Sequence, residues 1–375
     1  MVGVAIATAC SSPSPRAIPA TDTGSPVVTA APATIRSTFV RREVLVAPIA
    51  DDERLWPTPV WSGQDLFVAA VARAGTMRLL QLDPRANHWR ASSPAPFNAR
   101  GHLVSVLAWS GSEVLVAAAP SPPDGSAVAQ QYALYAYDPT AEHWRGIAAP
   151  PPELRLPLFH WTGSELLALG GSFGATATDA ASYSVSSNTW RPIEIPPFAE
   201  GSATLGPSRG FTVGKKTFFL MGYGERLIGL LYDADSGRWS WHATRAVESN
   251  TRLAFAQGDN VIVARRGVDE AIGRVDIFDM HTGQWLERRD TRFGDGPQIC
   301  GARALPVTSG AIVSFCSRLY DFDVQRDSWT TRPSDSVQAE LPQIVAAEID
   351  GSSYAFEWDP DRDIPILTRL TVVTR

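Results

Sequence analysis

Hydrophobic residues from about residue 38 onward fall into short runs that are joined by tight turns. One kind of run pair is a hydrophobic strand, a Gly turn and a second hydrophobic strand, as in VWSGQDLFVAA from Val60, LAWSGSEVLVAA from Leu107 and FHWTGSELLALGG from Phe159. Weaker copies begin at Phe211, Phe255, Pro306 and Ala346. Short apolar runs bounded by Gly, Asp, Asn and Ser predict β-strands, and no segment shows a convincing helical period over about ten residues.

A second kind of run pair follows six of these copies and ends in Trp. It joins an apolar strand, often closing in Tyr-Asp, through a polar turn to a Trp, as in LYAYDPTAEHW. Asp-Pro, Asp-Ser-Gly and His-Thr-Gly in these turns are residues that favour β-turns. The six Trp residues lie 44 to 55 residues apart and are Trp89, Trp144, Trp190, Trp239, Trp285 and Trp329.

Each repeat therefore predicts about four short antiparallel strands. Seven copies of the first run pair indicate seven sheets, and the 338 residues of 38–375 divide into about seven repeats. The last repeat ends in PILTRLTVV from Pro365 without an outer strand, and the segment TFVRREVLVAP from Thr38 has no other partner. We expect this N-terminal strand to complete the last sheet and close a ring, because closure protects exposed strand edges.

The strand that ends at Gly170-Gly171, the Tyr-Asp pairs and the repeated Trp resemble the kelch-repeat family. The resemblance covers nearly all of 54–375. It implies an all-β fold like the central domain of galactose-oxidase-like proteins, a seven-bladed β-propeller of four-stranded antiparallel blades over 38–375. The alternative is a six-bladed ring with irregular ends.

The residues at the N-terminus resemble an export signal. Residues 1–10 are a short apolar stretch whose end, Ala7-Thr8-Ala9-Cys10, resembles a bacterial lipoprotein signal in which the Cys is acylated. Residues 11–37 hold five Pro among Ser, Thr and Ala, which predicts a disordered tether. No apolar run is long enough to span a membrane, so we expect a lipid anchor on the membrane. The alternative is a terminus without function that carries a free Cys.

Composition narrows the classes of partner. Hydrophobic residues make up 44% of the chain, which excludes disorder over its whole length. The 33 basic and 39 acidic residues give a net charge of −6 and no basic patch for nucleic acid. Lys215 and Lys216 are the only lysines.

The 12 Trp residues suggest sugar binding at first, but their positions favour core packing. The six repeat-end Trp residues recur at one position, and Trp61, Trp109 and Trp161 recur at another. Trp56, Trp241 and Trp358 lie outside the pattern and are better candidates for exposed contacts.

Cysteine and histidine give one structural prediction and no metal site. Cys300 and Cys316 flank a hairpin centred near Thr308, so we predict a disulfide between them, with two buried free thiols as the alternative. The six His residues lack metal-ligand spacing, so we expect no metal and no cofactor. The copper chemistry of galactose-oxidase-like enzymes is not carried over, because Tyr137, Tyr232 and Tyr320 belong to the repeat and no Cys is evidently free to link to a Tyr.

Arginines near the first strands of several repeats are candidate ligand contacts. If first strands line a central channel, these side chains would form a cationic ring at one mouth that suits a carboxylate or phosphate. The alternative is that they are scaffold residues paired with neighbouring acids. They are Arg54, Arg100, Arg155, Arg209, Arg252 and Arg303.

These features predict an exported, membrane-anchored interaction module for a protein or glycan partner, and a monomer. The motivation is a regular scaffold in which no catalytic set is recognisable from the sequence. The longest insertion, residues 120–131, is the expected contact loop. The alternative is an enzyme that acts on a carbohydrate or another small molecule at the channel mouth.

Overall fold

The computed structural model describes residues 38–374 except 101, 121–131, 155–156, 171–178, 197–205, 224–225, 244–250, 267–271, 288–290, 293–301, 308–309, 316–317, 324–327, 332–343, 350–351 and 360–363. The chain divides into two units, Met1–Thr38 with Thr374–Arg375, and Phe39–Val373. Only Thr38 and Thr374 of the first unit are described. The described residues form 29 strands and contain no helix.

The described strands are arranged in seven antiparallel sheets, six of which follow the order of the chain. The first three sheets are β2(Glu53–Trp61), β3(Leu66–Ala72), β4(Met77–Asp83) and β5(His88–Ala91); β6(His102–Trp109), β7(Val114–Pro120), β8(Ala133–Asp138) and β9(His143–Ile147); and β10(Leu158–Trp161), β11(Leu166–Leu169), β12(Asp179–Ser184) and β13(Thr189–Glu194). The fourth and fifth are β14(Gly206–Val213), β15(Lys216–Tyr223), β16(Arg226–Asp233) and β17(Arg238–Ala243); and β18(Thr251–Gln257), β19(Asn260–Arg266), β20(Ile272–Asp279) and β21(Gln284–Glu287), with β22(Thr291–Arg292) beside β20.

The last two sheets complete the series. The sixth is β23(Ala302–Val307), β24(Gly310–Phe315), β25(Arg318–Asp323) and β26(Ser328–Thr331). The seventh has the order β1-β29-β28-β27 and consists of β1(Thr38–Leu45), β29(Ile364–Thr374), β28(Ser352–Asp359) and β27(Ile344–Ile349). The predicted pairing of the N-terminal strand with the last sheet is confirmed, because β1 is hydrogen-bonded to β29.

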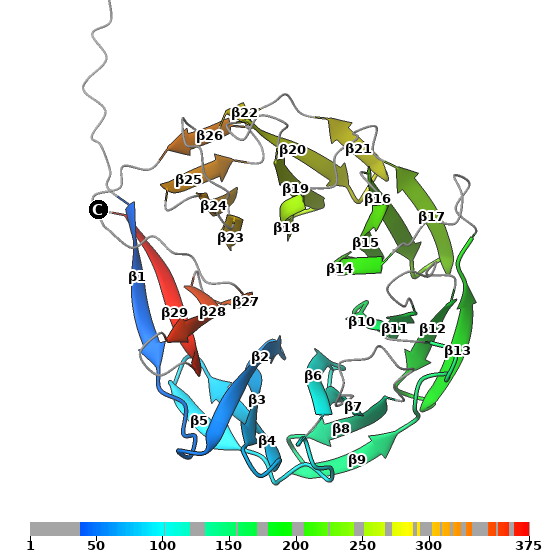
Figure 1. Cartoon of the computed structure of the whole chain (residues 1–375), viewed down its shortest axis with the longest axis vertical. Coiled ribbons are helices and arrows are strands. Elements are labelled where there is room, and N and C mark those ends of the chain that lie inside the picture. Colours follow the sequence, from blue (N-terminus) through cyan, green and yellow to red (C-terminus); the bar gives the residue numbers. More distant parts are fainter. Residues whose placement is uncertain are drawn as a thin grey trace, which may run out of the picture. The chain divides into compact units, whose positions relative to one another are not determined.

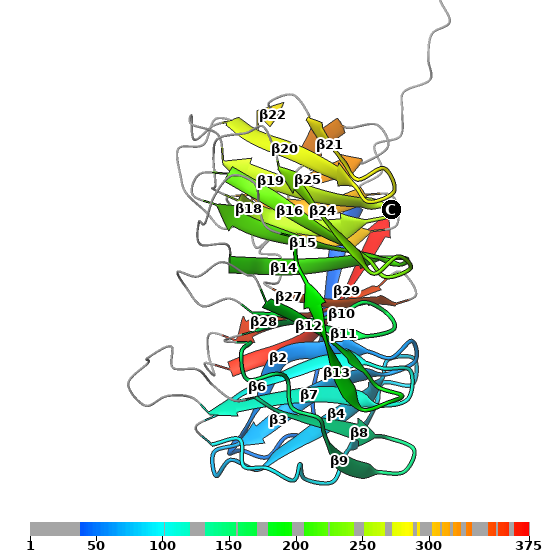
Figure 2. The same cartoon turned by 90° about the vertical axis from the view of Figure 1, so that its right-hand side faces the viewer.

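Within the second unit, the first strands of successive sheets contact one another in the order β2, β6, β10, β14, β18, β23, β27 and back to β2 (Figure 1). The tight turns that follow the first and third strands lie at one end of the sheets, to the right in Figure 2. We call this end the turn face and the other end the opposite face.

The Asp and Trp of the second run pair lie in the outer hairpins of four sheets. The Asp83 carboxylate accepts the backbone N–H groups of Arg85 and Ala86 at 2.9 and 3.1 Å, and Asp138, Asp233 and Asp279 make the same turn. Two residues before five of the six repeat-end Trp residues the backbone has a positive φ, at Asn87, Glu142, Asn188, Gly237 and Gly283. The Trp then lies directly across from an aromatic residue of the third strand in the pairs Tyr137 with Trp144, Tyr183 with Trp190, Tyr232 with Trp239 and Phe278 with Trp285.

The core lies between neighbouring sheets. One buried cluster joins the first and second sheets through residues such as Phe67 and Val116, and similar clusters fill the next three interfaces. Another joins the seventh sheet to the first, where Leu45, Tyr354 and Leu367 pack with Leu55 and Leu66. The first four sheets are therefore buried on both sides, which explains why their second strands are almost entirely apolar.

Candidate functional site

Acidic side chains stand at the end of three equivalent turns on the turn face. The turns read Ser62-Gly-Gln-Asp65, Ser110-Gly-Ser-Glu113 and Thr162-Gly-Ser-Glu165. The Thr162 hydroxyl accepts the backbone N–H of Glu165 at 3.1 Å, and the first Ser of the other two turns does the same. The second residue is a Gly with φ between +94° and +104°, a conformation that side chains disfavour. Each turn thus fixes a carboxylate at the start of a second strand.

The three carboxylates bind polar side chains of the outer strands. Asp65 accepts a hydrogen bond from Gln81 Nε2 at 2.8 Å. Glu113 accepts two from Arg145, at 2.7 Å from Nε and 2.6 Å from Nη2. Such paired contacts hold the hairpin against the outer strand of the same sheet.

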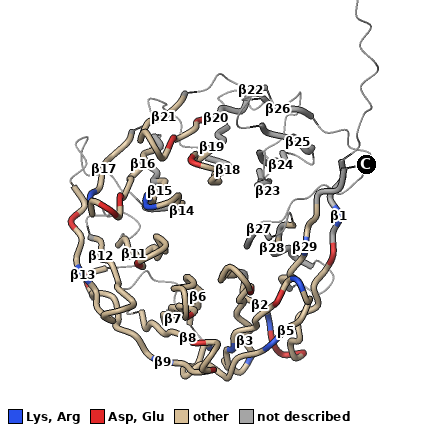
Figure 3. Tube along the Cα trace, turned by 180° about the vertical axis from the view of Figure 1, so that it is seen from behind, with Lys and Arg blue, Asp and Glu red and all other residues tan. Residues whose placement is uncertain are grey.

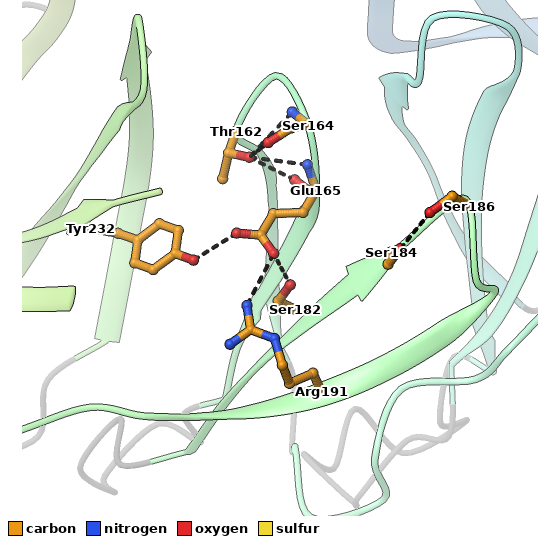
Figure 4. Close-up of polar contacts among 8 residues, drawn as sticks. All are labelled: Thr162, Ser164, Glu165, Ser182, Ser184, Ser186, Arg191 and Tyr232. Carbon is orange, nitrogen blue, oxygen red and sulfur yellow. Dashed lines mark hydrogen bonds and ion pairs between the residues drawn. The ribbon is translucent and has the colours of Figure 1, made fainter. Parts of the chain in front are cut away.

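Glu165 is the centre of the largest of these clusters (Figure 4). Its carboxylate accepts the Ser182 hydroxyl and, at 3.5 Å, Arg191 Nη2, both from its own sheet. Its other oxygen accepts the Tyr232 hydroxyl at 2.6 Å. Tyr232 lies on β16 of the fourth sheet, so this hydrogen bond crosses from one sheet to the next.

The protonation states favour a structural role for this cluster. Burial, and then the hydrogen bond to Glu165, raise the pKa of Tyr232 to about 12, so the phenol remains a donor at neutral pH. The Glu165 side chain is 17% exposed and receives three donors. A carboxylate held in this way stabilises the contact between sheets and is poorly placed to take a proton from a substrate.

A second polar cluster lies between the same two sheets. His160 Nε2 is 2.8 Å from Thr212 Oγ1, which donates to the Trp161 carbonyl oxygen at 3.2 Å and lies 2.9 Å from Thr217 Oγ1. Burial lowers the pKa of His160 to about 4, so the ring is neutral. A Cβ at Gly210 would lie 2.5 Å from His160 Nδ1, so the ring fits only against a glycine.

The predicted arginine ring is described in part. Arg54, Arg209, Arg252 and Arg303 lie near the start of β2, β14, β18 and β23, and therefore at the opposite face. Arg100 lies in the turn before β6, and Arg155 is outside the described residues. The side chains of Arg54 and Arg100 are exposed. The backbone places Arg54, Arg252 and Arg303 at the second residue of their strands and Arg209 at the fourth, and whether these residues bind a ligand stays a prediction.

The cysteine predictions fall outside the described part of the chain. Cys10, Cys300 and Cys316 are not described, and neither are residues 121–131 of the expected contact loop. The hairpin that Cys300 and Cys316 flank pairs Ala302 with Phe315 and Val307 with Gly310. Its centre lies between residues 308 and 309, half a residue beyond the centre assumed from the sequence.

The interpretation of the repeat-end Trp residues as core is confirmed where their side chains are described. Trp144 is 8% exposed and donates its indole N–H to the Ser93 carbonyl oxygen of the preceding sheet at 3.0 Å. Trp190 and Trp285 make the same bond to Ala148 and His242, at 2.8 and 3.0 Å. Trp89 and Trp239 pack against the core clusters. Trp61, Trp109 and Trp161 are likewise packed against such clusters.

The interpretation of Trp56 and Trp241 as candidates for exposed contacts is wrong. Trp56 packs against the cluster between the first two sheets. Trp241 donates to the Pro196 carbonyl oxygen at 2.7 Å, which is the inter-sheet bond that Trp239 does not make. The side chain of Trp358 is not described.

Two cavities open at opposite faces. A cavity of about 600 Å³ at the opposite face is lined by Tyr132, Ala133, Ala149, Pro150, Pro151, Pro152 and Leu154. Its Tyr132 ring packs edge-on against Phe159 at 5.3 Å between centroids, and burial raises the Tyr132 pKa. The other cavity, of about 250 Å³, lies at the turn face between the fourth and fifth sheets. Sequence reasoning missed both, because each is built from segments of separate strands.

The described residues contain neither a metal-binding cluster nor a membrane-spanning helix. They hold no group of three or more His, Cys, Asp or Glu side chains placed to bind a metal. Nor do they include a helix that is long and apolar enough to cross a membrane.

Comparisons with known proteins identify the class of fold. No protein-family model matches the chain, and no curated protein matches it by sequence. A prolyl endopeptidase structure is similar over 87% of this chain and 49% of its own, with 12% identity and a TM-score of 0.52. TolB from Acinetobacter baumannii matches 63% of this chain and 54% of its own, with 14% identity and a TM-score of 0.37. The fold is that of β-propeller proteins. The chain matches about half the length of each of these two proteins.

Proposed function

We propose that the chain is a closed, seven-bladed β-propeller of the kelch type that acts as an interaction module for a protein or glycan partner at the bacterial envelope. The seven sheets, the cyclic contacts of their first strands and the core between the seventh sheet and the first support the closed ring. The repeated Gly turns and Trp hairpins support the kelch type.

One observation supports the role as an interaction module. The polar groups best suited to chemistry, Glu165, Tyr232 and His160, form hydrogen bonds between sheets. The cavities, in contrast, open at the two faces and are lined by side chains that can contact a partner. Rigid blades with recognition surfaces at their ends suit binding better than catalysis.

The cavity at the opposite face is the proposed surface for a protein partner. Tyr132 and Pro150–Pro152 give it rigid, apolar side chains, which are common at the centre of protein interfaces. The insertion 121–131, which is the contact loop expected from the sequence, ends directly before Tyr132 in the chain.

The export of the protein and its anchoring to the membrane are also proposals. Ala7-Thr8-Ala9-Cys10 supports export with acylation of Cys10, and the Pro-rich residues 11–37 support a tether between anchor and propeller. Intact mass measurement on protein from membranes is expected to show cleavage before Cys10 and added acyl chains. An uncleaved, unmodified N-terminus would overturn the anchor.

Site-specific photocrosslinking tests the interaction role. A crosslinking residue at exposed Ala149 is expected to capture one defined envelope protein, whereas the same residue at exposed Asp51 captures none. Capture should be lost when residues 121–131 are replaced by a two-residue turn. That change is compatible with the fold because β7 and β8 already pair Ala118 with Ala133.

Two results would contradict the proposal. Equal capture from both positions, or capture that survives loss of the insertion, would remove the cavity as the partner site. A stoichiometric transition metal in the purified protein would favour the alternative, an enzyme at the channel mouth.

A further inference from the structure

The cavity at the turn face lies between four turns of the fourth and fifth sheets. It has a volume of about 250 Å³ and is lined by Val213, Gly214, Lys215, Lys216, Asp233, Asp235, Asp259, Met280 and His281. This is below the usual size of a pocket for a drug-sized ligand and suits one small polar unit.

Both lysines of the chain line this cavity, in a protein whose other basic residues are all Arg. They mark the positively charged stretch beside β14 and β15 in Figure 3. Lys215 Nζ forms an ion pair with Asp235 Oδ1 at 3.7 Å, and Asp233 and Asp259 also line the cavity, so the two signs of charge nearly cancel. A strongly charged ligand of either sign would therefore meet repulsion as well as attraction.

The turns hold these groups in fixed positions. Lys216 Nζ donates to the His281 carbonyl oxygen of the next sheet at 2.8 Å, which uses one of its three protons. The Met280 N–H donates to the Asp259 carbonyl oxygen at 2.8 Å, and the Ala234 N–H donates to the Lys215 carbonyl oxygen at 2.9 Å. No described residue is hydrogen-bonded to the Asp259 carboxylate, which is exposed.

We propose that this cavity binds a neutral sugar unit, such as the end of a glycan. A sugar hydroxyl both donates and accepts, so neighbouring hydroxyls can donate to Asp235 and Asp259 and accept from Lys215 and Lys216. The partly buried Val213 gives the lining an apolar member. The inference rests on the proposed function, because it names the chemistry of one partner of the interaction module.

Lysine footprinting on the full chain tests this binding directly. An amine-reactive acetylating reagent has only Lys215, Lys216 and the terminal amine to modify. The probes are the methyl glycosides of glucose, galactose, mannose and N-acetylglucosamine. We expect at least one glycoside to slow acetylation of both lysines more than twofold while the terminal amine reacts at an unchanged rate.

Two variants locate the site. Asp259→Asn keeps the shape of the side chain and is expected to weaken binding of that glycoside at least fivefold in calorimetry, because a hydrogen bond to a charged group is lost. Asp51→Asn, at an exposed position in the turn before β2, is the matched control and should bind as the parent does.

Three outcomes would overturn the inference. The first is that no glycoside protects the lysines, and the second is that Asp259→Asn binds as tightly as the parent. The third is that acetate or glycine protects them and no glycoside does, which would make the cavity a site for charged ligands. If these occur while crosslinking at Ala149 still captures a partner, the sugar site fails and the interaction role stands.

Discussion

His160 and Tyr232 are buried polar groups whose neighbours determine how they ionise. Both lie between the third and fourth sheets, and each makes a hydrogen bond across that interface, to Thr212 and Glu165. The cost of removing such groups from water is offset only while their partners remain in place. Substitutions here should therefore change stability in ways that depend on pH and on single hydroxyl groups.

Acidification should destabilise the protein through His160. Its pKa is about 4 in the folded state, below the ordinary value of 6.5, so the unfolded chain binds the proton first as pH falls. The contribution is complete above pH 6.5, is lost between pH 6.5 and 4, and amounts to at most about 3 kcal/mol. The partly buried His242, whose pKa is also lowered by burial, acts in the same direction.

Urea unfolding at pH 7.5 and pH 5 measures this effect. His160→Gln cannot titrate and should lose less stability than the parent over that interval. An identical loss in both proteins would show that His160 is not the group responsible.

Tyr232→Phe should lower the free energy of unfolding by about 1 to 3 kcal/mol, because it removes a hydrogen bond to a partly buried carboxylate. Tyr137→Phe is the matched control, since Tyr137 occupies the equivalent position of the second sheet and no described residue is hydrogen-bonded to its hydroxyl. Urea unfolding of the two variants gives the comparison. Equal losses would mean that the bond to Glu165 contributes little.

The hairpins that end in Trp are elements whose sequence explains their structure closely. Asp at the turn, a positive φ two residues before the Trp and an aromatic residue opposite it recur in successive sheets. The Asp and the aromatic residues are local sequence signals, so the strands and turns of these hairpins could be predicted from the sequence. The inter-sheet bonds of Glu165 could not, although the recurring acid after Ser-Gly or Thr-Gly was a visible signal.

The residues of the turn-face cavity could not be predicted from the sequence as one site. Lys216, Asp233, Asp259 and His281 come from four turns in two sheets, and nothing local to any one turn indicates the others. In the fourth sheet, Trp241 and not Trp239 donates the hydrogen bond to the neighbouring sheet. Local sequence does not indicate this either, because it depends on where the Pro196 carbonyl oxygen lies.

Replacing Trp190 by Phe should cost about 1 kcal/mol more than replacing Trp239 by Phe. Trp190 donates to the Ala148 carbonyl oxygen, whereas the buried Trp239 Nε1 has no hydrogen-bond partner among the described residues. Replacing Trp190 leaves its carbonyl acceptor without a hydrogen bond, which costs free energy. Replacing Trp239 removes a buried N–H group that had no partner, which lowers the cost of the substitution. Chemical denaturation of both variants measures the difference, and equal losses would contradict the assigned inter-sheet role.

The seventh sheet joins the two ends of the second unit. Arg369 of β29 donates to the Glu43 carboxylate of β1, at 3.0 Å from Nε, and Leu45 of β1 packs in the cluster shared with the first sheet. These contacts link residues separated by 326 positions in the chain. The stability of the whole unit should therefore depend on this one strand pair.

A charge exchange tests this dependence. Glu43→Arg and Arg369→Glu are each expected to lower the free energy of unfolding by up to about 1 kcal/mol, a modest effect because both side chains are partly exposed. The double variant, which reverses the pair, should recover part of the loss. Strictly additive losses in thermal unfolding would mean that the two charges do not interact.

The pairing of β1 with β29 also has a consequence for biosynthesis. β1 emerges from the ribosome long before β29, because Arg369 is made 326 residues after its partner Glu43. Until then the outer side of the first sheet, with Leu55 and Leu66, lacks the cover that Tyr354 and Leu367 give it. A chaperone that shields this surface during synthesis would thus act at the step most exposed to aggregation.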